Sequence, residues 1–206
     1  FSGVMDDLVI VKEVAGSGVF WPAEDIQTLD ALMPASAYVV KVENPITISF
    51  EDLEAVPVKP AENTIREGWD LLPPTGNSHV ISIPAGLLDI FEIGDQIGVF
   101  TNEDGCTGYV EIENFDNNLA MVVCGNDSTT GEHDGMMEGE VFNFRMYRSS
   151  TNLEYNLITG FDASMPDQGT YGHEGLSKLE SLEFDNTGIT EPGNSITVYP
   201  NPAGHE

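Results

Sequence analysis

The residues with the clearest chemical potential are oxygen ligands gathered in one acidic loop. Asp127, Glu132 and Asp134 lie within one short segment, and Glu138 and Glu140 follow soon afterwards. Calcium takes about six to eight oxygen ligands, and loops of this composition can supply them. The spacing does not fit the EF-hand pattern, and Asp and Gly also serve ordinary turns. The sequence therefore leaves two alternatives, a calcium site at Asp127, Glu132 and Asp134 or a solvated loop.

The two cysteines, Cys106 and Cys124, are candidates for a disulfide. Each borders one of two expected strands that flank a turn-rich segment, which indicates a hairpin. If Ile112 lies opposite Asn118, antiparallel pairing places the two cysteines opposite each other, at a separation that a disulfide can span. A register shift of one residue would instead leave two buried thiols. The surrounding segment lacks the basic groups that lower a thiol pKa, so we expect neither cysteine to be catalytic.

The remaining chemistry-bearing residues do not form a catalytic motif. The histidines are scattered and match no metal-binding spacing, and no nucleophile elbow or phosphate loop is present. A chain with so many carboxylates is compatible with a glycosidase that uses two of them as a catalytic pair. However, most of its acidic residues fall in turns or at the solvent-facing positions of alternating strands. Trp21, Trp69 and Tyr38 could form a sugar-binding platform, but large aromatic residues in short strands usually belong to the core. We therefore expect no enzymatic activity.

The charge balance excludes polyanionic partners. The chain has 35 Asp and Glu residues against 7 Lys and Arg residues, a formal net charge of −28. No basic residue lies between Arg66 and Arg145. Nucleic acid and anionic lipid need Lys and Arg to displace their counterions, so we expect neither as a partner. No apolar run approaches the roughly 18 residues that would span a bilayer, so we expect no membrane insertion.

Hydrophobic patterning predicts an all-β chain of tandem small antiparallel β-sandwich-like modules with a C-terminal linker. Residues 1–66 are expected to form one small module and residues 67–185 an antiparallel sandwich. The expected strands are residues 8–11, 19–21, 38–42, 46–50, 80–83, 96–100, 107–112, 119–124, 141–147 and 153–158. Short helices are expected over residues 24–33 and 84–91. Leu179, Leu182 and Phe184 are expected to complete the sandwich as an edge strand.

The C-terminal segment contains a short motif with two prolines. Residues 186–206 are expected to contain a polar linker and then a short strand that Pro200 and Pro202 end. The run Tyr199-Pro200-Asn201-Pro202 resembles the opening of the C-terminal sorting domain on type IX secretion cargo of Bacteroidota. That resemblance implies a secreted or cell-surface location, and the chain is then expected to be part of a longer precursor.

Two further blocks resemble modules of secreted Bacteroidota proteins. The first block is Val9-Ile10-Val11-Lys12, Gly16 to Gly18, Trp21-Pro22, Ile26 to Leu29 and Tyr38-Val39-Val40-Lys41. It departs from the usual pattern at Ala35-Ser36-Ala37, where the family usually has Gly. The second block includes Gly94 to Phe100, Cys106-Thr107-Gly108, Asp134-Gly135, Gly139-Glu140 and Phe144 to Arg148. In that family such modules lie immediately before the sorting domain and carry no catalytic motif.

These observations lead to a functional expectation with one alternative. We expect a non-enzymatic extracellular module, structural or adhesive, of a larger type IX-secreted surface protein or appendage. Its partners would be other modules of the same precursor or assembly and the type IX secretion machinery. No cofactor is expected, apart from the calcium considered above. The alternative is an accessory C-terminal region of a secreted hydrolase, with carbohydrate binding as one option.

Overall fold

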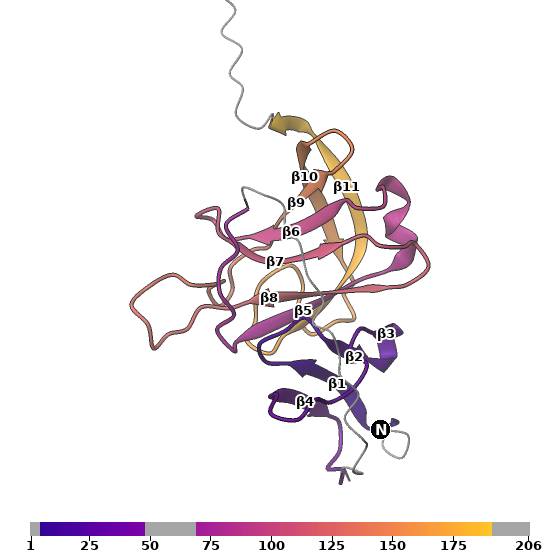
Figure 1. The fold of residues 1–206 in the computed structure, drawn as a ribbon, viewed down its shortest axis with the longest axis vertical. Helices are drawn as coiled ribbons and strands as arrows, with labels where there is room; N and C mark the ends of the chain where they lie inside the picture. The colour runs from indigo at the N-terminus through magenta and orange to yellow at the C-terminus, as the bar shows by residue number, and fades with distance from the viewer. Residues whose placement is uncertain (1–4, 48–68, 191–206) are drawn as a thin grey trace, which may run out of the picture.

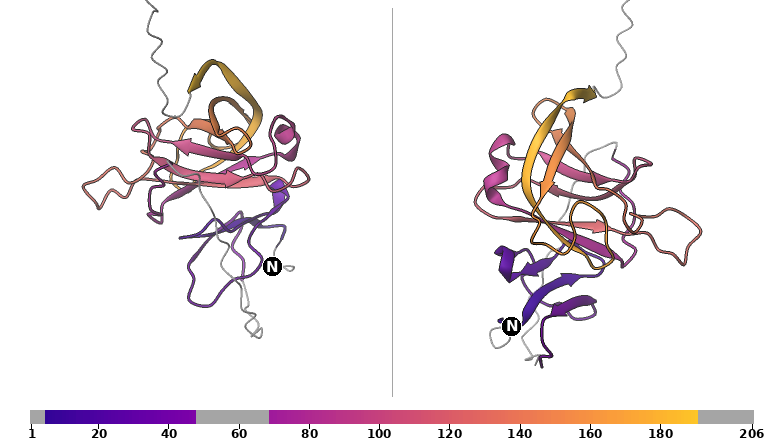
Figure 2. Two further views of the ribbon diagram at one scale, coloured as in Figure 1. Left: turned by 45° about the horizontal axis from the view of Figure 1, so that its top comes forward. Right: turned by 180° about the vertical axis from the view of Figure 1, so that it is seen from behind.

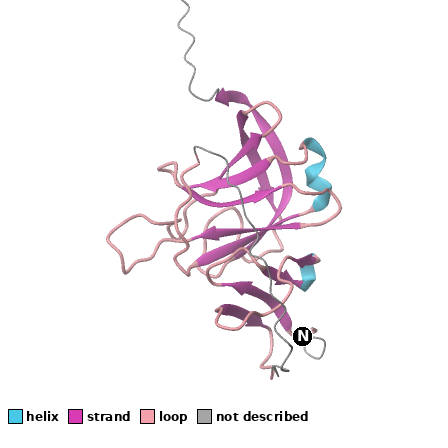
Figure 3. Ribbon diagram, viewed as in Figure 1, coloured by secondary structure: helices cyan, strands magenta, loops and turns pink. Residues whose placement is uncertain are grey.

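The computed structural model describes residues 5–47 and 69–190 and shows an all-β fold (Figures 1 and 3). Within these residues the strands form two sheets. The smaller sheet contains β1 (Leu8–Glu13), β2 (Val19–Trp21), β3 (Ile26–Gln27) and β4 (Tyr38–Val42). The larger sheet contains β5 (Ser78–Ile83), β6 (Gln96–Phe100), β7 (Cys106–Glu111), β8 (Leu119–Cys124), β9 (Asn143–Arg148), β10 (Leu153–Phe161) and β11 (Leu176–Thr190). Two short 3₁₀ helices, η1 (Pro22–Glu24) and η2 (Ala85–Ile90), complete the described elements.

The smaller sheet is antiparallel, in the order β3-β2-β1-β4. The predicted helix over residues 24–33 is wrong, because the segment starts with η1, turns at Asp25 and continues as β3. Asp25 adopts a left-handed conformation with φ 51°, and the backbone N–H groups of Thr28 and Leu29 both donate to Val19 O. The helix-like spacing arose because Ile26 and Leu29 are both buried, but in two different apolar clusters.

The larger sheet has the order β7-β6-β9-β10-β11-β5-β8 and is mixed rather than purely antiparallel. Its one parallel pair joins β11 to β5 with Leu176 opposite Val80, and the other described pairs are antiparallel. The apolar run Leu179, Leu182 and Phe184 therefore lies inside the sheet, where an edge strand was expected. β11 also extends to Thr190, so the linker predicted from residue 186 begins as strand.

The two ends of the larger sheet, β7 and β8, lie against each other without forming a ladder (Figure 1). The hairpin predicted for residues 107–112 and 119–124 is therefore wrong, since β7 pairs with β6 and β8 pairs with β5. The segment 70–77 connects the two ends instead. Its Leu72 N–H donates to Cys106 O at 2.8 Å, and Thr75 Oγ1 donates to Gly125 O at 2.5 Å. The curled sheet thus nearly closes on itself.

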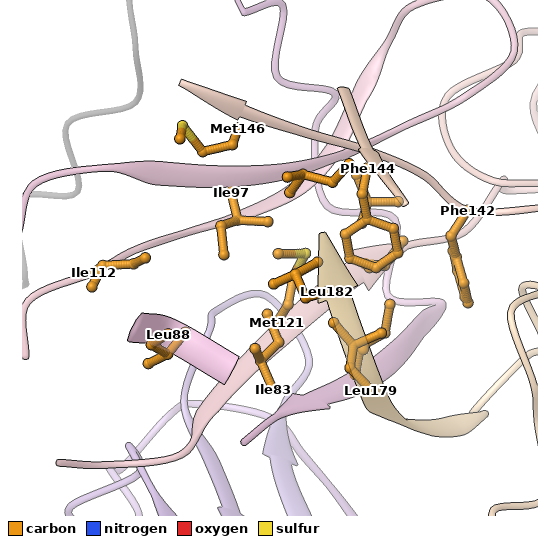
Figure 4. Packing of buried hydrophobic residues seen from close by; sticks show 14 of the residues in the cluster. Ile83, Leu88, Ile97, Ile112, Met121, Phe142, Phe144, Met146, Leu179 and Leu182 are labelled. Atoms are coloured by element: carbon orange, nitrogen blue, oxygen red, sulfur yellow. The ribbon is translucent and has the colours of Figure 1, made fainter. Parts of the chain in front are cut away.

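The main core fills the space inside this curled sheet (Figure 4). Ile83, Ile97, Met121 and Leu179 come from four different strands and are each 0% exposed. The predicted helix over residues 84–91 is confirmed as the 3₁₀ helix η2, which places Leu88 in this core. Burying each such side chain contributes about 1.5–3 kcal/mol, so this cluster is the main source of stability for the larger sheet.

The contact between β7 and β8 depends on a glycine. A Cβ atom at Gly108 would lie 2.2 Å from Val122 O, a clash with backbone that a rotamer change could not relieve. We expect Gly108→Ala to lower the free energy of unfolding by about 3 kcal/mol in urea denaturation. Gly131→Ala is the matched control, because nothing lies within 4 Å of a Cβ at Gly131. Equal stability of the two variants would show that β7 and β8 do not pack at this distance.

Candidate functional site at the joint between the two sheets

The two sheets share an apolar layer. The smaller sheet contributes Ile10, Trp21 and Ile26, and the larger sheet contributes Val80 and Leu176. Trp21 is the largest of these side chains and is 2% exposed. In Figure 1 the smaller sheet lies directly below β5 and β8, and both views in Figure 2 show the same arrangement. We call this contact region, together with the polar groups around it, the joint.

A buried cation stands at one side of the joint. Lys12 on β1 is 2% exposed, although Lys is almost never fully buried without a partner. Its Nζ donates to Ser78 Oγ at 2.6 Å and to Ser78 O at 3.1 Å, and it lies 3.0 Å from Glu174 Oε2. An ammonium group has three N–H donors, and these three acceptors can satisfy all of them. Lys12 therefore ties the smaller sheet to β5 and to the loop before β11.

The same loop is held by a buried histidine. His79 on β5 is 0% exposed, and its Nε2 lies 2.8 Å from Ser177 Oγ. The Ser177 hydroxyl donates to Asp167 O, which leaves it to accept from Nε2–H of His79. In that tautomer Nδ1 accepts the N–H of Gly172 at 3.1 Å; Nδ1 also lies 3.1 Å from Gly172 O, to which it donates in the other tautomer. Burial lowers the pKa of His79 to about 4, so the ring is neutral in this network at neutral pH.

A second ion pair stands at another point of the joint. Glu24 of η1 lies 2.9 Å from Lys178 Nζ on β11 and accepts a hydrogen bond from Ser82 Oγ at 3.1 Å. Asn118 also donates its side-chain N–H to Glu24 O at 2.7 Å. The short helix that follows Trp21 is therefore anchored to three parts of the larger sheet and its turns.

The other ion pairs of the described chain are also structural. Arg148 lies 3.3 Å from Asp95, a carboxylate that is 0% exposed, and Arg145 pairs with Asp104 and Glu154. Among the Lys and Arg residues within the described ranges, only Lys41 forms no ion pair.

The acidic loop predicted as a calcium site uses its carboxylates to shape itself. Asp127 Oδ1 accepts hydrogen bonds from the N–H and hydroxyl of Thr129, which lower the pKa of Asp127. Asp134 accepts from Asp127 N–H at 2.7 Å and from Thr130 Oγ1 at 3.0 Å, while Glu132 is exposed. Across residues 5–47 and 69–190 no group of three or more Asp, Glu, His and Cys is placed to hold a metal. The side chains of Asp127 and Asp134 thus hold the turns of this loop.

Both cysteines are free thiols in the structure. The predicted disulfide was derived from a hairpin register that β7 and β8 do not adopt, so that derivation is wrong. Cys106 is buried, donates its S–H to Gly108 O at 3.6 Å, and has its pKa raised by burial to about 12. Burial also raises the pKa of Cys124. Neither thiol is activated as a nucleophile.

The remaining predicted site residues are not brought together. Trp21 lies in the joint, whereas Trp69 packs edge-on against Phe100 and donates its indole N–H to Glu154 at 3.0 Å. Tyr38 belongs to a third cluster, so these aromatic residues form no platform. The predicted sorting signal at 199–202 and most of the predicted strand 46–50 lie outside the described residues.

The joint was missed from the sequence, although one signal was present. Lys12 follows directly on the apolar run 8–11, and His79 precedes the apolar run 80–83. A charged or titratable side chain within a buried strand requires a partner, but the partners Ser78 and Glu174 are distant in sequence from Lys12. Only the tertiary structure identifies them.

Comparisons with protein-family models, curated proteins and solved structures found no match. Within the described residues no helix is long and apolar enough to cross a membrane.

The buried cation gives a direct test of the joint. We expect Lys12→Ala to lower the free energy of unfolding by about 3 kcal/mol, because it leaves a cavity, an unpaired Ser78 hydroxyl and a carboxylate without its cation. Lys41→Ala on the neighbouring strand is the matched control, because Lys41 is exposed, and should change stability by less than about 0.5 kcal/mol. Equal effects in chemical denaturation would show that Lys12 is solvated.

The histidine predicts a specific pH dependence. Native His79 stays neutral down to about pH 4, whereas the unfolded chain binds a proton near pH 6.5. The unfolded state therefore binds more protons between these values, and stability is lost as the pH falls through this window, by about 3 kcal/mol.

The carboxylates also change the stability with pH, and they do so in the native protein and in a His79 variant alike. The quantity to measure is therefore the difference in the free energy of unfolding between the two proteins. The native protein should lose about 3 kcal/mol of its stability relative to His79→Gln between pH 7 and pH 4. The exposed residue His173 serves as the control through His173→Gln. A pH-independent difference between the native protein and His79→Gln would mean that His79 titrates alike in the folded and unfolded states.

Proposed function

We propose that this chain is a non-enzymatic structural module of a larger extracellular protein that is exported through type IX secretion. The observation that carries the proposal is the position of the two ends of the fold. β1 begins at one end of the long axis, and β11 finishes at the other end (Figures 1 and 2). A chain that enters at one pole and leaves at the opposite pole extends an assembly along its axis.

The joint supports this role because it makes one body of two sheets. Modules joined by a small polar interface move relative to each other by default. Here Trp21 and its apolar neighbours are buried between the sheets, and the Lys12 and Lys178 ion pairs fix the contact at two points. A spacer built in this way holds the segments at its two ends at a fixed distance and orientation.

The chemistry of the buried polar groups supports a role without catalysis. Three of the buried polar groups, Lys12, His79 and Asp95, are each engaged by structural partners. The strongly negative charge also suits a protein that stays soluble in salt-containing extracellular fluid. The resemblances of the two blocks within residues 9–41 and 94–148, and of Tyr199–Pro202, support the location.

An export experiment tests both the location and the spacer role. A reporter is placed ahead of this chain, followed by the complete native C-terminus of its precursor, in a bacterium with type IX secretion. We expect the reporter outside the cell. Deleting residues 5–190 should preserve export but reduce antibody labelling of the reporter several-fold, because the reporter then lies closer to the surface layer. An unrelated β domain of similar length should restore the labelling.

The outcomes separate the two parts of the proposal. Retention of the reporter in the periplasm would contradict the type IX location. Export with unchanged labelling after the deletion would contradict the spacer role. Loss of export on deletion of residues 5–190 would also contradict it, since this segment would then act in secretion.

A further inference from the structure

A polar hollow of about 430 Å³ opens where two strands of the larger sheet part. The ladder between β9 and β10 ends at Arg145 opposite Asn156, although β9 reaches back to Asn143 and β10 continues to Phe161. On its other side, β10 changes register with β11 between Tyr155 and Leu157. Asn156 therefore lies at a β-bulge, a feature that often redirects a side chain next to a binding site.

Three side-chain amides line this hollow, from Asn102, Asn143 and Asn156. The Asn143 amide donates to Phe100 O at 3.3 Å and to Asn102 Oδ1 at 3.1 Å, which accounts for its two N–H groups. Its carbonyl oxygen remains as an acceptor. Asn156 is exposed and makes no side-chain hydrogen bond to the described residues, so it can both donate and accept. Amides of this kind match hydroxyl groups, which also donate and accept.

The charges of the hollow disfavour an anionic ligand. Arg145 contributes one positive charge, but Asp104 and Glu154 both pair with it, and Asp185 adds a further carboxylate to the lining. The guanidinium also lies 4.4 Å from the centre of the Phe100 ring, which holds it in place. A phosphate, a sulfate or a uronic acid would meet more negative than positive charge here.

The apolar part of the lining is small, because its three residues are each more than nine-tenths buried. Phe142, Phe144 and Leu157 take part in the lining, and the rings of Phe142 and Phe144 pack edge-on with centroids 6.3 Å apart. Both phenylalanines are held in the main core, so this part of the lining is rigid. Figure 4 shows the two rings side by side at one end of the core. A mainly polar lining with a small apolar part suits a ligand that is rich in O–H groups.

We propose that this hollow binds a neutral saccharide. The volume falls within the range of small-ligand pockets, about 300–1,000 Å³. The amides and carboxylates bind hydroxyl groups, and the excess negative charge rejects acidic sugars. The site adds a ligand to the module and does not depend on the spacer role, because its binding is measured on the isolated chain.

The test uses the full chain of 206 residues and defined probes. Maltose, cellobiose, lactose and diacetylchitobiose are titrated by ¹H–¹⁵N NMR, with digalacturonic acid as the acidic counterpart. We expect at least one neutral disaccharide to shift the amide signals of Asn143 and Asn156, and digalacturonic acid to shift neither. Asn156→Ala should weaken that binding about fivefold, the loss of one or two neutral hydrogen bonds.

Matched variants separate the site from its surroundings. Asn156→Trp should fill the hollow and abolish binding, whereas Asn117→Ala, at an exposed turn residue, should leave it unchanged. The NMR spectrum of each variant reports whether it is folded. Absence of shifts with all neutral probes would overturn the proposal, as would binding that Asn156→Trp leaves intact or tighter binding of digalacturonic acid.

Discussion

The burial of one ammonium group constrains the arrangement of both sheets. Lys12 can remain charged away from water only if several acceptors surround it, since an unpaired buried charge costs several kcal/mol. Those acceptors come from Ser78 and Glu174. Glu174 itself adopts a left-handed conformation with φ 53°, in a loop that the His79 ring fixes through Gly172. β1, β5 and the loop before β11 must therefore be placed together.

This constraint explains how so acidic a chain stays compact. At a net charge of −28, the negative charges repel one another across the surface. A cation offsets this repulsion most where it lies close to a carboxylate. The described arginines and two of the three described lysines lie in ion pairs between elements distant in sequence. Lys41, the exception in the described residues, lies on the edge strand β4, where a charge discourages pairing with another chain.

Most strands were predictable from the sequence, whereas their pairing was not. Alternating apolar residues and turn signals located β4, β6 and β8 at their observed bounds, because these strands are defined by their own residues. The parallel pairing of β11 with β5 brings together residues about a hundred positions apart, and local pattern carries no such information. The incorrect hairpin between β7 and β8 shows the same limit. Neighbouring strands were assumed to pair, yet each found a different partner.

The candidate sites also differ in whether they depend on local sequence or on strand pairing. The acidic loop was recognised from composition, and Asp127 and Asp134 form hydrogen bonds within their own segment. Neither the joint nor the hollow at Asn156 could be predicted, since each depends on where strands meet or part. Such sites emerge only when the register of every neighbouring strand is known.

Native-state hydrogen exchange is the most direct test of the claim that the two sheets form one body. Amide hydrogens in β1 and β2 should exchange only through global unfolding, with the same opening free energy and denaturant dependence as those in β5 and β8. The opening free energies are equal if the contacts of the joint prevent the smaller sheet from unfolding while the larger sheet stays folded. Faster exchange of β1 and β2, with little dependence on denaturant while β5 and β8 stay protected, would show that the smaller sheet opens independently and would contradict the account.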